Sequence, residues 1–123
     1  MKNIFYLFSF FLFISCKNKE EKTSKVEEQI VVSVETGKQL FETSNCTACH
    51  QIAEKVVGPS LQNIAKIYQS KKGNLVSFLK AEANPIVDPS QYQSMKINLE
   101  ITKTMSDNEL KALEIYILNF SKP

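Results

Sequence analysis

The sequence predicts an all-α domain of four to five short helices, and two observations carry this prediction. Apolar residues recur at helical spacing directly after residues that favour helix N-termini. Glycine is scarce, with three residues in the chain, and no stretch alternates β-branched and polar residues as a half-buried strand does. A length of 123 residues suits one domain, so we expect a single helical unit.

The first 15 residues have the pattern of an export signal. Lys2 precedes the apolar run IFYLFSFFLFI at residues 4–14, which is shorter than the roughly 20 residues that span a membrane. The run ends before Cys16, and charged residues follow, which resembles a bacterial lipoprotein signal. Residues 1–15 are therefore expected to be removed, and a lipidated Cys16 would anchor an exported protein on the periplasmic side of a bacterial membrane. The alternative is ordinary cleavage nearby, with Cys16 lost or left free.

Residues 16–35 are predicted to be a flexible tether. From Lys17 the segment is largely polar and contains no aromatic residue, so it has little to bury against a core. A flexible chain of this length spans on the order of 25 Å. The apolar stretch IVVSV at residues 30–34 leaves a short strand as the alternative. The folded domain is expected to occupy residues 36–123.

The first two helices of this domain begin at residues that favour helix N-caps. Thr36 is predicted to cap a helix over residues 37–43. Ser60 is predicted to cap a helix over residues 61–69, and its apolar residues recur at i, i+3 and i+7: Leu61, Ile64 and Tyr68.

The second half of the domain has three further helix signals. Asn74 is predicted to cap residues 75–83, and Asp88–Pro89 to start a short helix, because proline is tolerated at the first helical position. The last helix has the strongest signals, since Ser106 and Glu109 form a capping box ahead of apolar residues on one face: Leu110, Leu113, Ile117 and Phe120.

The motif CTACH at residues 46–50 holds two cysteines and the one histidine of the chain. Three chemistries compete for Cys46, Cys49 and His50: a redox-active dithiol, part of a zinc site, or a covalent haem anchor. A thioredoxin-like dithiol needs an α/β context, which the helical pattern lacks. A structural zinc ion needs four ligands, and Cys16 is remote. The spacing C-x-x-C-H is the attachment signature of c-type haem, which we favour.

Four stretches together resemble a small bacterial class I cytochrome c: GKQLF from Gly37, CTACH, VGPSL from Val57, and MSDNELKALEIYI from Met105. The resemblance covers nearly the whole folded domain and implies the cytochrome c fold around one haem c. It assigns thioether bonds to Cys46 and Cys49, and it makes His50 the proximal iron ligand.

The resemblance also implies residues around the iron ligands. Pro59 matches the proline whose carbonyl accepts the second ring N–H of the histidine. With Met1 in the leader, the distal ligand is Met95 or Met105. Met105 precedes the Ser106 cap and is explained by hydrophobic packing there. We therefore expect Met95, in a loop, to be the distal ligand, with Asn98 bonding its sulfur.

These expectations describe an electron carrier and not an enzyme, because a six-coordinate iron has no open position for a substrate. Redox partner proteins are expected, with a monomeric chain tethered to the membrane. The net charge of +2 is too weak for a nucleic-acid-binding domain. Two alternatives stay open: a haem-based sensor or ligand-binding domain, and a haem subunit of a larger redox enzyme.

Overall fold

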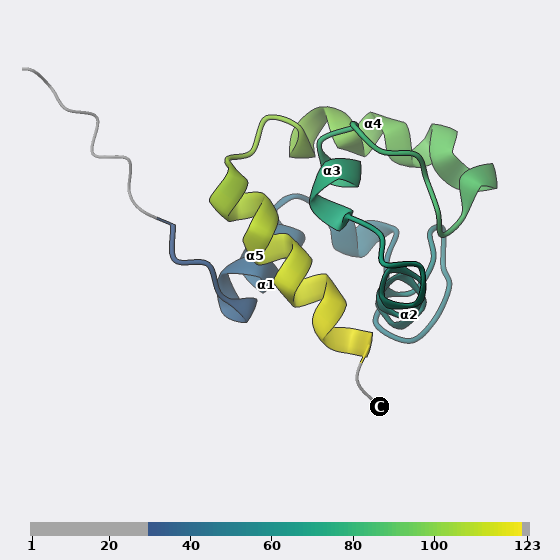
Figure 1. The fold of residues 1–123 in the computed structure, drawn as a ribbon, viewed down its shortest axis with the longest axis horizontal. Coiled ribbons are helices and arrows are strands. Elements are labelled where there is room, and N and C mark those ends of the chain that lie inside the picture. Colours follow the sequence, from purple (N-terminus) through teal and green to yellow (C-terminus); the bar gives the residue numbers. More distant parts are fainter. Residues whose placement is uncertain (1–29, 122–123) are drawn as a thin grey trace, which may run out of the picture.

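The computed structural model of the protein describes residues 30–121, which fold into five α-helices (Figure 1). The predicted signal, the lipidation site at Cys16 and most of the predicted tether lie outside the described residues. Residues 30–121 contain no strand, so the prediction of an all-α domain is confirmed. The helices are α1 (Val34–Thr43), α2 (Leu61–Lys71), α3 (Leu75–Leu79), α4 (Tyr92–Thr102) and α5 (Asp107–Leu118).

Three single-turn 3₁₀ helices join or extend these elements in the described part of the chain: η1 (Cys46–Ala48), η2 (Pro89–Gln91) and η3 (Asn119–Ser121). None of the helices between residues 30 and 121 has the length and hydrophobicity of a membrane-spanning segment.

Helix α1 begins one turn earlier than predicted. Its N-cap is Ser33 and not Thr36, and the Ser33 hydroxyl accepts a hydrogen bond from the Thr36 backbone N–H at 3.1 Å. Serine and threonine both cap helices, and the extended backbone of Ser33 places its oxygen over this N–H group. The helix therefore starts at Val34, two residues before the predicted start of the domain. Residues 30–33 form no strand.

Helices α1 and α5 cross at close range (Figure 1). Gly37 is buried, and a Cβ built on it would overlap the backbone of Ala112 and lie 2.7 Å from the Cβ of Tyr116. The Phe41 and Tyr116 rings pack beside this crossing with centroids 5.4 Å apart. The missing side chain of Gly37 is therefore what lets the two helices approach.

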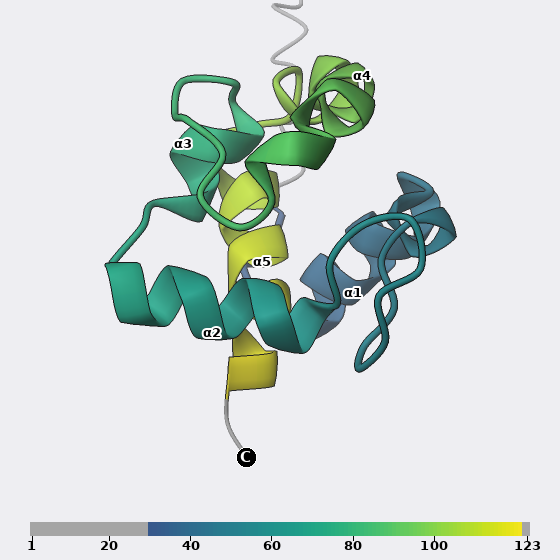
Figure 2. The ribbon, with the colours of Figure 1, turned by 90° about the vertical axis from the view of Figure 1, so that its right-hand side faces the viewer.

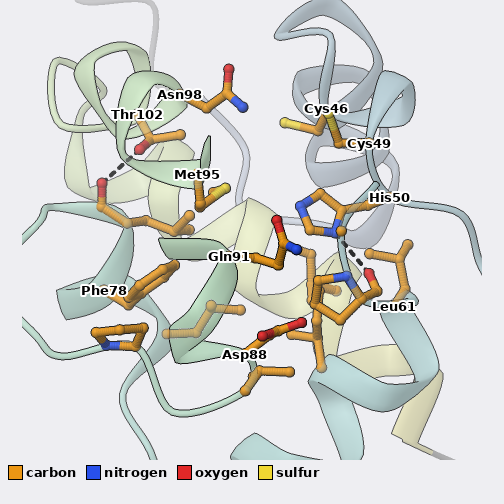
Figure 3. A pocket seen from close by; sticks show the side chains of 18 of the residues that line it. Cys46, Cys49, His50, Leu61, Phe78, Asp88, Gln91, Met95, Asn98 and Thr102 are labelled. Carbon is orange, nitrogen blue, oxygen red and sulfur yellow. Dashed lines mark hydrogen bonds between the residues drawn. The ribbon is translucent and has the colours of Figure 1, made fainter. Parts of the chain in front are cut away.

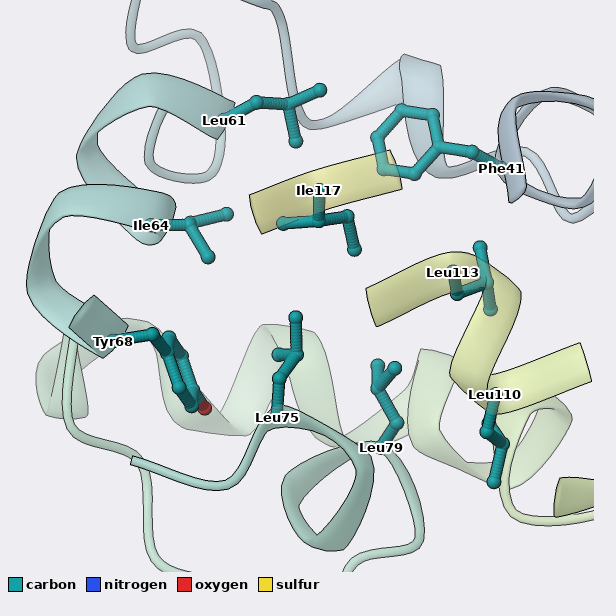
Figure 4. Close-up of a cluster of buried hydrophobic side chains, with 9 residues drawn as sticks. All are labelled: Phe41, Leu61, Ile64, Tyr68, Leu75, Leu79, Leu110, Leu113 and Ile117. Carbon is teal, nitrogen blue, oxygen red and sulfur yellow. The ribbon is translucent and has the colours of Figure 1, made fainter. Parts of the chain in front are cut away.

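The core lies where α2 and α3 meet this crossing, with α2 packed across α5 (Figures 2 and 4). It contains apolar side chains that are at least nine-tenths buried: Phe41, Leu61, Ile64, Tyr68, Leu75, Leu79, Leu110, Leu113 and Ile117. The predicted apolar faces of the second and last helices therefore both point inward, apart from Phe120, which is half-buried at the edge of the core.

The caps of α2 and α3 are the predicted ones. The Ser60 hydroxyl accepts from the Asn63 N–H at 3.2 Å, and the Asn74 side chain accepts from the Ser77 N–H at 2.9 Å. Helix α2 ends at Lys71, and its C-cap residue Lys72 adopts a left-handed backbone conformation.

Helix α3 is shorter than predicted and ends at Leu79 instead of residue 83. Ala81 adopts a positive φ of 61°, and the Glu82 N–H donates back to the Ser77 carbonyl at 2.9 Å. This is the pattern of a Schellman motif, which closes a helix. Glycine is the usual residue at that position, so the sequence AEA contained no recognisable stop signal.

Helix α4 corrects the prediction that Met95 lies in a loop. Asp88–Pro89 starts a helical turn as predicted, but η2 leads directly into an α-helix that continues to Thr102. Only Leu99 and Thr102 are buried on this helix. Its apolar periodicity is correspondingly weak, which is why the sequence pattern did not reveal it.

Helix α5 begins at the predicted capping box. The Glu109 N–H donates to the Ser106 hydroxyl at 3.3 Å, and the Ser106 N–H donates to the Glu109 carboxylate at 2.7 Å. Met105 is half-buried against the core that contains Leu110, in agreement with its predicted packing role.

Candidate functional site

One apolar cavity opens between the segment that follows α1 and the segment that runs from α3 through α4 (Figure 3). About 1110 Å³ of space is free of atoms there, including the open mouth. Residues of all five described helices line this space, and most of the lining residues are apolar. Leu113 and Ile117 of α5 also line it.

Cys46 and Cys49 lie on one side of the cavity, with His50 next to them (Figure 3). Asn45 turns the chain out of α1 with a positive φ of 59°, and η1 follows. The His50 backbone N–H then donates to the Cys46 carbonyl at 3.0 Å. This single turn brings all three side chains of the motif to the cavity wall.

The two thiols are half-buried and are not joined in a disulfide. Burial raises the pKa of the Cys46 thiol above its ordinary value, and the neighbouring Cys49 raises it further. A redox-active dithiol needs a lowered thiol pKa, so the surroundings of Cys46 do not favour that chemistry. Within residues 30–121, no three side chains of His, Cys, Asp or Glu come together as a metal cluster requires.

His50 is held on two sides by the loop that precedes α2. Its Nδ1 lies 2.7 Å from the Pro59 carbonyl oxygen, so Nδ1–H donates and Nε2 is left as the available ligand atom. Gly58 lies against the ring, because a Cβ built there would be 2.5 Å from His50 Cε1 and 2.9 Å from Nδ1. The Gly58 N–H also donates to the Cys49 carbonyl at 2.9 Å. The loop therefore sets both the position and the rotation of the imidazole.

The opposite side of the cavity is formed largely by α4. Met95 and Asn98 line it from successive turns of this helix, as do Gln91 at its start and Thr102 at its end (Figure 3). Met105 is not among the lining residues and packs instead against the core at the start of α5. The structure thus brings Met95 and His50 to one cavity and leaves Met105 out of it.

The remaining wall is apolar. It contains five large apolar side chains of α2 and α3: Leu61, Ile64, Leu75, Phe78 and Leu79. Tyr68 also lines the cavity, and burial raises the pKa of its phenol to about 12. A covalent haem fits this site, because the two thiols, the imidazole and the thioether face an enclosure otherwise made almost entirely of carbon.

Three residues of the site were not predicted from the sequence: Asp88, Gly58 and Thr102. Asp88 lines the cavity and forms an ion pair with Lys55 at 2.9 Å, which joins the segment before α4 to the loop after His50. Gly58 was part of the quoted VGPSL stretch, but its contact with the imidazole depends on how the loop folds back. No sequence signal marked Thr102, since a threonine near a helix end is common.

Comparison with known proteins agrees with this site. Residues 34–121 match the Cytochrome c family. Cytochrome c-552 of Nitrosomonas europaea is 37% identical over 79 residues, which are 64% of this chain and 73% of that protein. Cytochrome c-551 of Azotobacter vinelandii is 44% identical over 39 residues, which are 32% of this chain and 48% of the relative.

Cytochrome c-551 of Pseudomonas denitrificans is 42% identical over 33 residues, or 27% of this chain and 40% of that protein. The alignments thus span less than half of both c-551 proteins. The family match covers every described helix and the whole cavity, and Cys46 and Cys49 have the spacing that attaches one haem c. The chain therefore belongs to the cytochrome c family.

Proposed function

We propose that this protein transfers single electrons through one haem c whose iron is held by His50 and Met95. The observation that carries the proposal is that one apolar cavity is lined by Cys46, Cys49 and His50 on one side and by Met95 on the other. When bound, the haem iron supplies a redox centre that accepts and releases one electron.

The residues of the chain tune this centre in three ways. Pro59 orients the His50 ring through the hydrogen bond to Nδ1 and raises its donor strength. Asn98 lies one turn after Met95 on the same wall of the cavity and is the proposed partner of the Met95 sulfur. The apolar wall excludes water, and His/Met ligation raises the reduction potential relative to His/His. With both axial positions taken, the protein is proposed to be an electron carrier and not an enzyme.

The ligand assignment has a direct test in the purified holoprotein. The ferric wild-type protein should show a Met–Fe(III) charge-transfer band, and Met95→Ala should abolish it. Met105→Ala is the matched control, because Met105 packs at the start of α5 and does not line the cavity. Loss of the band in Met105→Ala with its persistence in Met95→Ala would reverse the assignment.

Binding of external ligands to the purified holoprotein distinguishes an electron carrier from a haem-based sensor. A carrier should cycle between ferric and ferrous states without readily binding carbon monoxide. Ready binding of carbon monoxide at neutral pH would contradict simple electron transfer and support a sensor. Isolation of the native protein in a stable complex with an enzyme would instead support the role of a haem subunit.

We further propose that the protein is exported and acts as a monomer, on the periplasmic side of a bacterial membrane, with redox partner proteins. The leader at residues 1–15, the lipidation site at Cys16 and the tether are proposed from the sequence pattern, and α1 limits the tether to residues 16–33. Cys16→Ser should release the holoprotein from the membrane fraction with its haem intact. Retention of that variant in the membrane fraction would contradict a lipid anchor.

A further inference from the structure

Helix α4 carries Met95 but buries few of its own residues. Of its 11 residues, only Leu99 and Thr102 are buried, whereas α2 and α5 each bury four. Ile97, which does not line the cavity, is 74% exposed, and Ile101, which does line it, is 49% exposed. Few apolar contacts therefore hold this wall of the cavity, and specific ties matter more here than elsewhere.

A buried hydrogen bond at the C-terminal end of α4 joins this helix to α3. The Thr102 hydroxyl donates to the Leu79 carbonyl oxygen at 2.6 Å, drawn as a dashed line in Figure 3. A longer contact, of 3.4 Å, joins the same hydroxyl to Leu99 within its own helix. Leu79 is the last residue of α3, where carbonyl groups have no partner inside the helix. Thr102 thus satisfies a buried acceptor and fastens α4 to α3.

The other polar ties of this wall lie on the surface. Lys55 pairs with Asp88, and Lys71 donates to the Ile86 carbonyl at 3.0 Å, both from exposed lysines. Exposed ion pairs contribute little to stability. A buried acceptor that loses its partner costs considerably more.

We propose that Thr102 is a positioning residue for the distal ligand: its hydrogen bond to Leu79 holds α4 closed, and thereby holds Met95 against the haem iron. This inference rests on the proposed ligation by Met95. Opening of α4 breaks the hydrogen bond between Thr102 and Leu79 and withdraws the Met95 sulfur. An external ligand then takes the vacated position.

The experiment measures imidazole binding to the ferric holoprotein at neutral pH, followed by loss of the Met–Fe(III) band. Thr102→Val keeps the shape of the side chain and removes the hydroxyl. It should bind imidazole about tenfold more tightly than the wild type, because the loss of one buried hydrogen bond makes opening about tenfold more favourable.

Thr104→Val is the matched control. Thr104 lies two residues after the end of α4. Its exposed hydroxyl donates to the Ile101 carbonyl of that helix at 2.8 Å. Its imidazole affinity should equal that of the wild type. Equal affinities in the two valine variants would overturn the proposal, as would a Thr102→Val protein that melts earlier but binds imidazole unchanged.

A second pair keeps the test decisive if the valine variant does not accumulate. Thr102→Ser retains the hydroxyl and Thr102→Ala lacks it, so only the alanine variant should gain imidazole affinity. Equal affinities of this pair would again overturn the role of Thr102. A wild-type protein without the Met–Fe(III) band would overturn the ligation by Met95 as well, which separates the failure of the proposed function from the failure of this inference alone.

Discussion

At the scale of single residues, Gly58 is a constraint on His50 that a sequence motif does not explain. The backbone of Gly58 lies where any side chain would meet the imidazole, and the next residue accepts the hydrogen bond from Nδ1. A proximal ligand held in this way has one rotational state. The ring orientation is therefore built into the loop and does not depend on the cofactor.

Gly58→Ala should rotate or displace the imidazole, because the new Cβ would lie 2.5 Å from Cε1. We expect a loss of about 1–3 kcal/mol in the free energy of unfolding, as overpacking usually costs, together with shifted g values in the ferric electron paramagnetic resonance spectrum. Gly73→Ala is the control, since its Cβ would meet Ile86 and Tyr68 and not the ligand. Unchanged g values in Gly58→Ala would contradict the proposed constraint.

Tyr68 makes stability depend on pH in the alkaline range. The pKa of its phenol is raised from 10.0 to about 12, because burial disfavours the phenolate. Above pH 10 the unfolded chain loses this proton while the folded chain keeps it, so the unfolded state is favoured. Stability contributed by the neutral phenol is complete below pH 10 and declines as the pH rises towards 12.

The measurement is urea unfolding at several pH values between 8 and 12, in the wild type and in Tyr68→Phe. The variant cannot ionise at this position, so its stability should fall less steeply above pH 10. Parallel curves for the two proteins would show that Tyr68 titrates normally.

At the scale of elements, the crossing of α1 and α5 depends on one missing side chain. Gly37→Ala would add a Cβ 2.0 Å from the carbonyl oxygen of Ala112. The two helices would therefore have to separate. Alanine favours helix by up to about 1 kcal/mol over glycine, but overpacking should dominate and destabilise the protein by about 1–3 kcal/mol.

Denaturant unfolding of the holoprotein measures this change. Lys38→Ala is the matched control, because the adjacent residue is exposed on the same helix, and its effect should stay within about 0.5 kcal/mol. A Gly37→Ala protein as stable as this control would show that the crossing tolerates a methyl group.

At the scale of the whole molecule, the core and the cofactor cavity are largely the same set of side chains. The shared residues belong to α1, α2, α3 and α5: Phe41, Leu61, Ile64, Tyr68, Leu75, Leu79, Leu113 and Ile117. Without the haem, each of these residues would face an open cavity and lose contacts on one side. The cofactor therefore completes the hydrophobic core as well as supplying the redox centre.

Replacing both Cys46 and Cys49 by Ala removes covalent attachment. This variant should lack a cooperative melting transition in calorimetry and should lose much of its helical circular dichroism, because short helices are marginal without tertiary packing. Cys16→Ser is the control and should melt like the wild type. A cooperative transition of the haem-free variant at the wild-type temperature would contradict a core completed by haem.

Much of the fold and of the proximal site was predictable from local signals. The caps at Ser60, Asn74 and Ser106 mark their helices because each side chain bonds a backbone N–H two or three residues away. The cap at Ser33, the early end of α3 and the whole of α4 were missed. At Ser33 the sequence offers a second cap residue, Thr36, within the same turn. At the end of α3 an alanine adopts the left-handed conformation in which glycine is expected. In α4 only two residues are buried, so the apolar periodicity is weak.

The sequence by itself determined the helical class and the haem attachment at Cys46 and Cys49. It also indicated His50, which directly follows Cys49, as the proximal ligand. These features depend on residues close together along the chain, where spacing alone sets geometry. Only the tertiary structure decided that Met95 stands on a helix facing His50, that Met105 is left outside the cavity, that Gly58 contacts the imidazole, and that Thr102 fastens α4 to Leu79. Each of these depends on segments from 8 to 45 residues apart meeting at one cavity, and local propensities carry no information about such meetings.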